Sequence, residues 1–350
     1  MSEDHKFIAP PAMLLRPHDA KLTSGLQAPD LNGSPRVDTR QESGISSEKV
    51  RPLVTNSPEL TATIVICTRN RPAEMRKCLS AISGLERVPD EVIVVDNTNG
   101  NEETESVSRE FGATYIVEPN PGLSRARNRG LQESQSAIVV YLDDDAFPEK
   151  NWLGTLLVPF ACPQIGLVTG ETVKSRADLA NQRYEACRVL NNADPEWFEI
   201  AAYGGLGIGA NMALRRDKCT DWTVFDERMG RGAPLDGMEE HHAFVRLLFR
   251  GNRAVHLPDA VVIHSSQRPS NVILEARNSF AYWLILFSEY PDYRSKLIRF
   301  LVRRLFHRPL GWHRDSPDPG EIMASDLPSL VKAGIAGLFL FLRNRKPKPK

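Results

Sequence analysis

The sequence predicts an α/β protein with a doubly wound, mainly parallel sheet flanked by helices. Between residues 61 and 145, short apolar runs rich in valine and isoleucine alternate with segments of helical spacing. Strands that are apolar throughout are typical of a parallel sheet that helices cover on both faces. Ligands bind such sheets beyond the carboxyl ends of the strands, so polar residues that follow a strand are candidates for the site.

The first half of the sheet is predicted in chain order. Ile64–Cys67 is a short apolar strand, and Pro72 suits the first turn of the next helix because its missing N–H would have no partner there. Three further strands are expected at "EVIVVDN", "TYIVE" and "AIVVYLDDD". A polar helix over 102–111 and a helix over "SRARNRGLQES", capped by Ser124, are expected between them.

Composition places the chain among soluble folded proteins. It has 350 residues, of which 41% are hydrophobic and 25% charged, and a formal net charge of +0. That balance argues against a protein whose overall charge binds nucleic acid. The five cysteines form no CxxC pair, so neither a disulfide framework nor a zinc knuckle is indicated, and a cytoplasmic location is favoured. The start, "MSEDHKFIAPPAMLLRP", lacks the basic region and apolar core of a signal peptide.

Carboxylates cluster directly after the fourth predicted strand. Asp143, Asp144 and Asp145 are adjacent, and like charges so close cost stability unless a cation faces them. The polar loop Thr68–Arg71 and Asp96 also follow strands, so all three groups fall on the same edge of the sheet. Hard cations such as Mg²⁺ and Mn²⁺ take oxygen ligands and bind carboxylates together with substrate phosphates. This edge therefore predicts a metal-bridged diphosphate site.

Four motifs occur in series along the chain: "IVICTRNRP", "EVIVVDN", "NPGLSRARNRGL" and "YLDDDAFPEKNWL". Together they resemble the family 2 glycosyltransferases, which have the nucleotide-diphospho-sugar transferase (GT-A) fold. The resemblance runs from about Thr61 to about Ser270. It implies transfer of a sugar from a nucleotide-diphospho-sugar to an acceptor hydroxyl, with Mn²⁺ or Mg²⁺ as cofactor, in cell-surface polysaccharide or glycolipid synthesis.

The resemblance implies that part of the site holds the donor. Thr68, Asn70 and Asp96 match positions that hold the nucleoside, and Asp96 would accept hydrogen bonds from the base or ribose. A helix cap or solvated turn is the alternative for Asp96. Arg125 and Arg127 border the nucleotide in the family. Their spacing of two places them on different helix faces, so one is expected to reach the donor and the other to be structural.

The metal site is likewise implied by the resemblance. Asp143 and Asp145 match the family's DxD pair, with Asp145 as direct metal ligand, Asp143 on the ribose or the metal's water shell, and Asp144 turned away. His264 follows another apolar strand, where some members of the fold complete the metal shell with a histidine; a structural histidine is the alternative. Asn211 in "LGIGANMALRRD" is a candidate beside the sugar, with close backbone packing of the glycines as the alternative.

The helix "MEEHHAFVRLLFRG" resembles the family's helix-opening Glu-Asp element. Glu239 matches its first residue, and Arg246 keeps the spacing of seven. Glu240 stands where the family usually has the aspartate base. It is expected to take the acceptor proton, because a base needs hydrogen-bond reach more than a particular side chain. One base and one displacement imply inversion. The alternative is that both glutamates only complement a helix N-terminus.

The chain is expected to have three regions. They are a flexible leader (1–58), a GT-A domain (59–270) with a nucleotide-binding half (59–150) and an acceptor half (151–270), and a helical basic extension (271–350). In "SKLIRFLVRRLF" the apolar residues share one helical face, as in helices that lie on an anionic membrane. Packing on the catalytic domain is the alternative. The expected partners are a nucleotide-sugar donor, a saccharide or lipid-linked acceptor, and the inner face of the cell membrane.

Other protein classes share parts of this pattern. A sugar nucleotidyltransferase should have a glycine-rich loop after its first strand, whereas "CTRNRP" has no glycine. A receiver or phosphatase domain would gather acids and Mg²⁺ at such an edge but would not account for "GLSRARNRG". A non-catalytic nucleotide-sugar-binding protein with the same fold would be revealed by loss of the metal carboxylates, which are present here.

Overall fold

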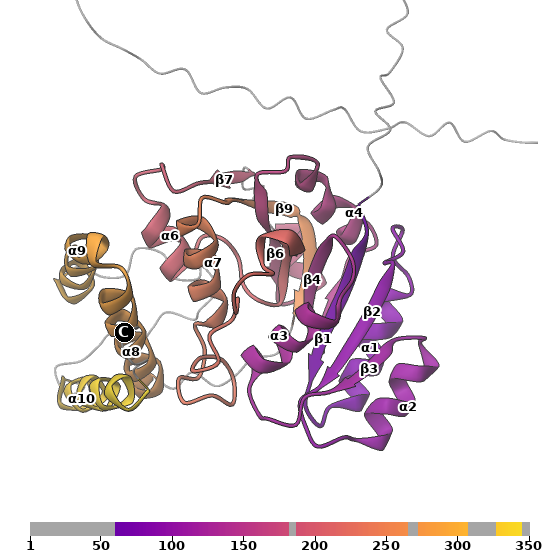
Figure 1. Cartoon of the computed structure of the whole chain (residues 1–350), viewed down its shortest axis with the longest axis horizontal. Coiled ribbons are helices and arrows are strands. Elements are labelled where there is room, and N and C mark those ends of the chain that lie inside the picture. Colours follow the sequence, from indigo (N-terminus) through magenta and orange to yellow (C-terminus); the bar gives the residue numbers. More distant parts are fainter. Residues whose placement is uncertain (1–59, 182–186, 265–271, 307–326, 345–350) are drawn as a thin grey trace, which may run out of the picture. The chain divides into compact units, whose positions relative to one another are not determined.

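The computed structural model describes residues 60–181, 187–264, 272–306 and 327–344 (Figure 1). Its strands are β1 (Ala62–Thr68), β2 (Glu91–Asp96), β3 (Thr114–Val117), β4 (Ile138–Asp143), β5 (Ala146–Pro148), β6 (Ile165–Val173), β7 (Arg188–Leu190), β8 (Asn211–Arg215) and β9 (Arg253–His264). They form one nine-stranded sheet in the order β3-β2-β1-β4-β8-β6-β9-β5, and β7 pairs with β9.

Helices flank this sheet (Figure 1). They are α1 (Pro72–Ile82), α2 (Glu102–Glu110), α3 (Leu123–Glu133), α4 (Trp152–Leu157), α5 (Arg176–Asn181), α6 (Trp197–Tyr203), α7 (Glu239–Phe249), α8 (Val272–Glu289), α9 (Arg294–Phe306) and α10 (Leu327–Arg343). Of these, α8, α9 and α10 lie together beyond α6 and α7 (Figure 1). Short 3₁₀ turns occur at Val158–Ala161, Arg216–Lys218 and Pro291–Tyr293.

The predicted parallel half of the sheet is confirmed. β3, β2, β1 and β4 are neighbours, and each pair among them is parallel. Alternate residues of β1 point to opposite faces, as the strand period of two requires. Ile64 and Ile66 pack with Met75 of α1, whereas Val65 packs with Ala126 of α3. The strand is apolar throughout because both faces are covered.

One predicted helix start is wrong. Gly122, in a positive-φ conformation, occupies the N-cap position of α3, and Ser124 lies inside the helix. The Ser124 hydroxyl donates a hydrogen bond to the carbonyl of Met229 at 2.7 Å. Since this partner lies 105 positions away in the chain, local sequence did not reveal it.

The second half of the sheet is mixed. β8 lies antiparallel between β4 and β6, and the long strand β9 runs parallel to β6. β5 pairs antiparallel with β9 so that Ala146 lies opposite His264. This register places the end of β9 beside the acidic residues that precede Ala146.

The C-terminal helices pack on the domain with one side only. Leu297 of α9 is buried, its carbonyl accepts a hydrogen bond from the Trp283 indole, and the Phe300 ring stacks on Tyr203 at 4.0 Å between centroids. Ile298 and Val302 of the same helix are about half exposed, at 48% and 47%. The predicted single apolar face is therefore divided between the core and the surface. No described helix is long and apolar enough to cross a membrane.

Candidate active site

The strand ends predicted to form one edge do so. Thr68 lies opposite Asp96 across β1 and β2, and Cys67 lies opposite Asp143 across β1 and β4. A cavity of about 530 Å³ opens at this edge. It is lined by Cys67, Thr68, Arg69, Arg71, Asn97, Pro121, Gly122, Leu123, Ala126, Asp143, Asp144, Asp145, Arg231 and Gly232.

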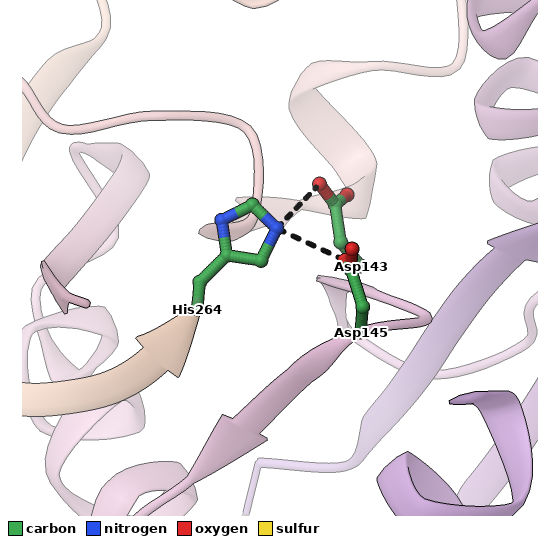
Figure 2. Close-up of side chains that lie close together, drawn as sticks. All are labelled: Asp143, Asp145 and His264. Atoms are coloured by element: carbon green, nitrogen blue, oxygen red, sulfur yellow. Dashed lines mark hydrogen bonds and ion pairs between the residues drawn. The ribbon is translucent and has the colours of Figure 1, made fainter. Parts of the chain in front are cut away.

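Three predicted metal ligands converge at the cavity. The Nε2 atom of His264 lies 2.9 Å from Oδ1 of Asp145 and 3.9 Å from Oδ2 of Asp143 (Figure 2). One ligand atom from each residue lies within 4.8 Å of the others. Carboxylate oxygens suit Mg²⁺ and Mn²⁺, and an added imidazole nitrogen favours a transition metal over Mg²⁺. The donor set fits a divalent cation, and Mn²⁺ fits it better than Mg²⁺.

The charges around Asp145 keep it ionised. Burial opposes this, but the hydrogen bonds from His264 and Arg71 outweigh burial and hold the pKa of Asp145 well below its usual range. For His264, burial lowers the pKa, yet the hydrogen bond to Asp145 and the charge of Asp143 raise it overall. The positive charge of Arg231 opposes that rise to a smaller degree. Asp145 and His264 together therefore suit a site in which a metal cation and a proton compete for the same side chains.

Asp144 lines the cavity beside Asp143 and Asp145 and is buried. Its Oδ2 accepts a hydrogen bond from the Thr68 hydroxyl at 2.7 Å, and its Oδ1 pairs with Arg71 at 2.8 Å. Burial raises the pKa of Asp144 to about 6, although Thr68 and Arg71 oppose the rise. Arg71 also pairs with Asp145 at 2.7 Å. Asp144 and Asp145 therefore hold the loop after β1 in place through Arg71.

Arg127 joins the metal carboxylates to the predicted catalytic helix. Its Nη1 donates to Oε1 of Glu239 at 2.8 Å, and its Nη2 lies 3.4 Å from Oδ1 of Asp143. Burial and the charge of Glu240 raise the pKa of Glu239 to about 7, while Arg127 opposes the rise. The other oxygen of Glu239, Oε2, is buried without a hydrogen-bond partner in the described part of the chain. The Glu240 side chain is 16% exposed and lies 3.9 Å from Nδ1 of His241.

The residues expected to hold the nucleoside lie in different settings. Asp96 is fully buried, and its two oxygens accept hydrogen bonds from Thr98 at 2.8 Å and Tyr115 at 2.7 Å. Asn70 is exposed in a left-handed backbone conformation and does not line the cavity. Arg125 pairs with Glu227 at 2.7 Å outside the cavity lining. Of the two arginines in that motif, Arg127 is the one that reaches the site.

Asn211 makes the contacts of a structural residue. It is fully buried, its Oδ1 accepts from the Trp152 indole at 2.8 Å, and its Nδ2 donates to the carbonyls of Glu171 and Ala260. These three bonds tie β8 to α4, β6 and β9. This placement favours the packing alternative over a contact with the sugar.

A second acidic group has a different character. Asp226, His242 and Glu289 lie close enough to hold a metal, but the Arg228 guanidinium donates to Asp226 at 2.6 Å and to Glu289 at 2.8 Å. The Arg228 guanidinium thus already provides the positive charge between these carboxylates. We interpret this acidic group as a salt-bridge cluster.

Sequence reasoning missed three cavity residues. Asn97 donates to the carbonyls of Glu118 and Asn120 and accepts from the amide of Gly122, so it shapes the cavity wall. Arg71 pairs with two aspartates, and Arg231 lies on a loop between glycines. Arg71 was detectable because it follows β1 by only three residues. The contact made by Asn97 was not, since it depends on the packing of a distant loop.

Comparison with known proteins identifies the domain. Residues 63–220 match the family described as glycosyl transferase family 2. This matched segment belongs to glycosyl transferase family 2. The match covers β1 to β8 with the aspartates, and the predicted site residues Glu239, Glu240 and His264 lie beyond it.

Individual relatives agree with this assignment. The chain is 28% identical over 182 residues to glycosyltransferase AglE of Haloferax volcanii, covering 49% of this chain and 58% of that protein. It is 27% identical over 208 residues to the pre-mycofactocin glycosyltransferase of Mycobacterium tuberculosis, covering 58% and 42%. The chain thus spans about half the length of these curated relatives.

A solved structure shows the same fold. The mannosyltransferase PcManGT from Pyrobaculum calidifontis, in complex with GDP-Man and Mn²⁺, aligns with a TM-score of 0.53 over 83% of this chain and 89% of that chain. At 18% identity, this likeness shows the fold alone. The predicted GT-A fold is confirmed.

Proposed function

We propose that the protein is a metal-dependent glycosyltransferase that moves a sugar from a nucleotide-diphospho-sugar to an acceptor hydroxyl with inversion. The observation that carries this proposal is the convergence of Asp143, Asp145 and His264 at the edge of the 530 Å³ cavity. Two relatives named as glycosyltransferases, and the mannosyltransferase in complex with GDP-Man and Mn²⁺, support it. Synthesis of a polysaccharide or another glycoconjugate is the expected setting.

The chain's own residues divide the work of such a reaction. Asp143, Asp145 and His264 would hold Mn²⁺ or Mg²⁺, which supplies Lewis-acid stabilisation to the departing nucleoside diphosphate. Thr68 and Asn97 line the part of the cavity nearest β1 and β2, where the nucleoside is expected. The walls of the cavity keep the donor fixed in position for in-line displacement.

Glu240 is the proposed base. It takes the proton of the acceptor hydroxyl while the acceptor oxygen bonds to the anomeric carbon and the bond from that carbon to the phosphate oxygen breaks. The diphosphate leaves with the electron pair. Glu239 is already engaged by Arg127, whereas within the described part of the chain the nearest cationic group to Glu240 is His241 at 3.9 Å, which supports the second glutamate as the one that reaches the acceptor.

The direct experiment is a panel of nucleotide sugars with Mn²⁺ or Mg²⁺, read out as release of nucleoside diphosphate. We expect one donor to be turned over and the rate to depend on the metal. The anomeric configuration of the product tests inversion, and a retained configuration would contradict it. If a donor binds but is neither hydrolysed nor transferred under any condition, the result would favour a non-catalytic nucleotide-sugar-binding protein instead.

We also propose a peripheral position at the inner face of the cell membrane, with a lipid-linked acceptor. The side of α10 that faces away from α8 presents four exposed apolar residues at helical spacing: Ile335, Leu338, Phe339 and Leu342. Exposed Lys332 and Arg343 lie on the same helix, and the chain ends in "RKPKPK". Apolar residues flanked by basic ones fit an anionic lipid surface.

Flotation with anionic and neutral liposomes tests the membrane position. Replacing Phe339 and Leu342 with serine should release the protein from anionic liposomes at low salt. Val158→Ser is the matched control, because Val158 is 70% exposed elsewhere on the domain. Equal recovery of wild-type protein in the unbound fraction with both liposomes would contradict the membrane position and leave the transferase proposal standing.

A further inference from the structure

The three arginines that line the cavity differ in the groups that they contact. Arg71 is paired with Asp144 and Asp145. Arg69 donates to the carbonyl of Asn97 at 2.9 Å. Arg231 is exposed at the cavity, and no carboxylate lies within ion-pair distance of it in the described part of the chain. Its charge nevertheless acts on His264, so it lies within electrostatic range of the metal-binding group.

The backbone at Arg231 is held in place over the start of α3. Its carbonyl accepts a hydrogen bond from the amide of Leu123 at 2.9 Å, next to the bond from Ser124 to Met229. Gly230 and Gly232 on either side adopt φ of +97° and +85°, a region that side chains rarely adopt. The chain therefore makes a tight loop, here called the Arg231 loop (residues 226–237), whose tip lies at the cavity.

Both ends of the Arg231 loop are tied to α8. At the start, Arg228 donates to Asp226 within the loop and to Glu289 at the end of α8. At the other end, Nδ2 of Asn278 donates to the carbonyl of Asp236 at 2.8 Å. Inside the loop, the amide of Leu235 donates to the carbonyl of Arg228 at 3.1 Å. A loop fixed at both ends and in the middle holds the backbone of Arg231 at the cavity, so that less binding energy is used to order the loop.

We propose that Arg231 is a donor-binding residue that contacts the diphosphate of the nucleotide sugar. This inference rests on the proposed function and deepens it. Guanidinium groups bind phosphate oxygens with charge-assisted, often bidentate hydrogen bonds. Arg231 combines the right chemistry, a fixed backbone and a place at the cavity of the metal-binding aspartates.

The charges in the cavity explain why such a residue is needed. A divalent cation bound by Asp143 and Asp145 would be balanced by those two carboxylates. The charge of Arg71 is likewise balanced by the one remaining carboxylate, Asp144. The negative charge of a diphosphate then lacks a counter-charge, which Arg231 supplies. A phosphate on a lipid-linked acceptor could use the same group, so the test is made with nucleotide alone.

The experiment is calorimetric titration of UDP and GDP into the full chain at saturating Mn²⁺, without acceptor. Arg231→Ala should weaken binding of the nucleotide that the wild type prefers by roughly 10- to 100-fold, as expected for loss of a hydrogen bond to a charged group. Arg231→Lys should recover part of the affinity because it keeps the charge. The affinity of Arg231→Ala should also depend less on salt than that of the wild type.

Arg109→Ala serves as the matched control, because Arg109 is exposed on α2, outside the cavity, and pairs only with Glu105 on the same helix. It should bind nucleotide like the wild type. Equal affinity of wild-type protein and Arg231→Ala would overturn the donor contact and leave the proposed function intact. If neither UDP nor GDP binds the wild type, the proposed function itself fails.

Discussion

Arg127 and Glu239 form a buried ion pair at 2.8 Å between residues that lie 112 positions apart in the chain. Both side chains are almost completely buried, at 3% and 6% exposed. Through this pair, the helix that follows β3 holds the first residue of the proposed catalytic helix. The guanidinium also lies 3.4 Å from Asp143, so one cation links the base region to the metal region.

The pair should be coupled energetically. Arg127→Met would leave Glu239 buried without its partner. Removal of one member of a buried pair lowers the free energy of unfolding by several kcal/mol. Here we expect a loss of about 2 kcal/mol, because Glu239 can bind a proton instead. The double variant Arg127→Met, Glu239→Gln should lose less stability than the sum of the two single variants. Urea unfolding at neutral pH measures all four proteins. Additive losses would mean that the two residues act independently.

The two neighbouring glutamates should differ in catalysis. Glu240→Gln keeps size and removes the proton acceptor, so transfer should fall by roughly 10²-fold or more. Donor affinity measured by calorimetry should stay close to wild type. Glu239→Gln still accepts a hydrogen bond from Arg127 and should lose less activity. A larger loss in Glu239→Gln would show that the two roles are reversed.

Asn211 should matter for stability and not for donor binding. Asn211→Ala removes three hydrogen bonds, two of them buried, and leaves the buried Trp152 indole without this acceptor, at a cost of about 3 kcal/mol. Thermal and urea unfolding measure this loss. Nucleotide affinity of the remaining folded protein should be unchanged at low temperature. A variant of wild-type stability with weak donor binding would return Asn211 to the sugar site.

The salt bridges of Glu289 should make stability depend on acidic pH. Burial raises the pKa of Glu289, but His242 and Arg228 outweigh burial and lower it from 4.5 to about 2. A depressed pKa stabilises the fold above the unfolded value of 4.5, and this contribution is lost as pH falls from 4.5 toward 2.

Glu289→Gln should therefore be less stable than the wild type above pH 4.5, and the difference should shrink as the pH falls. We expect a difference of about 2 kcal/mol near neutral pH, because the pair is partly exposed and water screens it. Urea unfolding between roughly pH 3 and pH 7 checks this, since the window covers the titration of the unfolded carboxyl group and the first part of the loss below it. A difference that is the same at every pH would assign the loss to packing and not to charge.

The sequence predicted those parts of the site that local pattern determines. The carboxyl ends of β1, β2 and β4 could be read from runs of apolar residues, and this brought Thr68, Asp96 and the aspartates to one edge. His264 also followed from its place after an apolar strand. Its approach to Asp145 depends on the pairing of Ala146 with His264, which joins segments 118 positions apart in the numbering.

The partners of other site residues could not be predicted from the sequence, and most of them lie far away in the chain. Ser124 resembles a helix cap in local sequence but bonds Met229, and Asn211 resembles a sugar contact but bonds Trp152. Asp96 lies at the predicted edge, yet its oxygens are taken by Thr98 and Tyr115. Side-chain pairing of this kind follows from tertiary packing, which local spacing does not specify.

The most direct measurement of metal-dependent transfer compares wild-type protein with Asp145→Asn across Mn²⁺ concentrations, using release of nucleoside diphosphate from the preferred donor. Asp217→Asn is the matched control, since Asp217 is exposed and does not line the cavity. Circular dichroism verifies that all three proteins are folded. The wild type and Asp217→Asn should show rates that rise with Mn²⁺ and saturate, whereas Asp145→Asn should stay at the metal-free rate. A folded Asp145→Asn protein that reaches the wild-type rate at saturating Mn²⁺ would contradict the metal site.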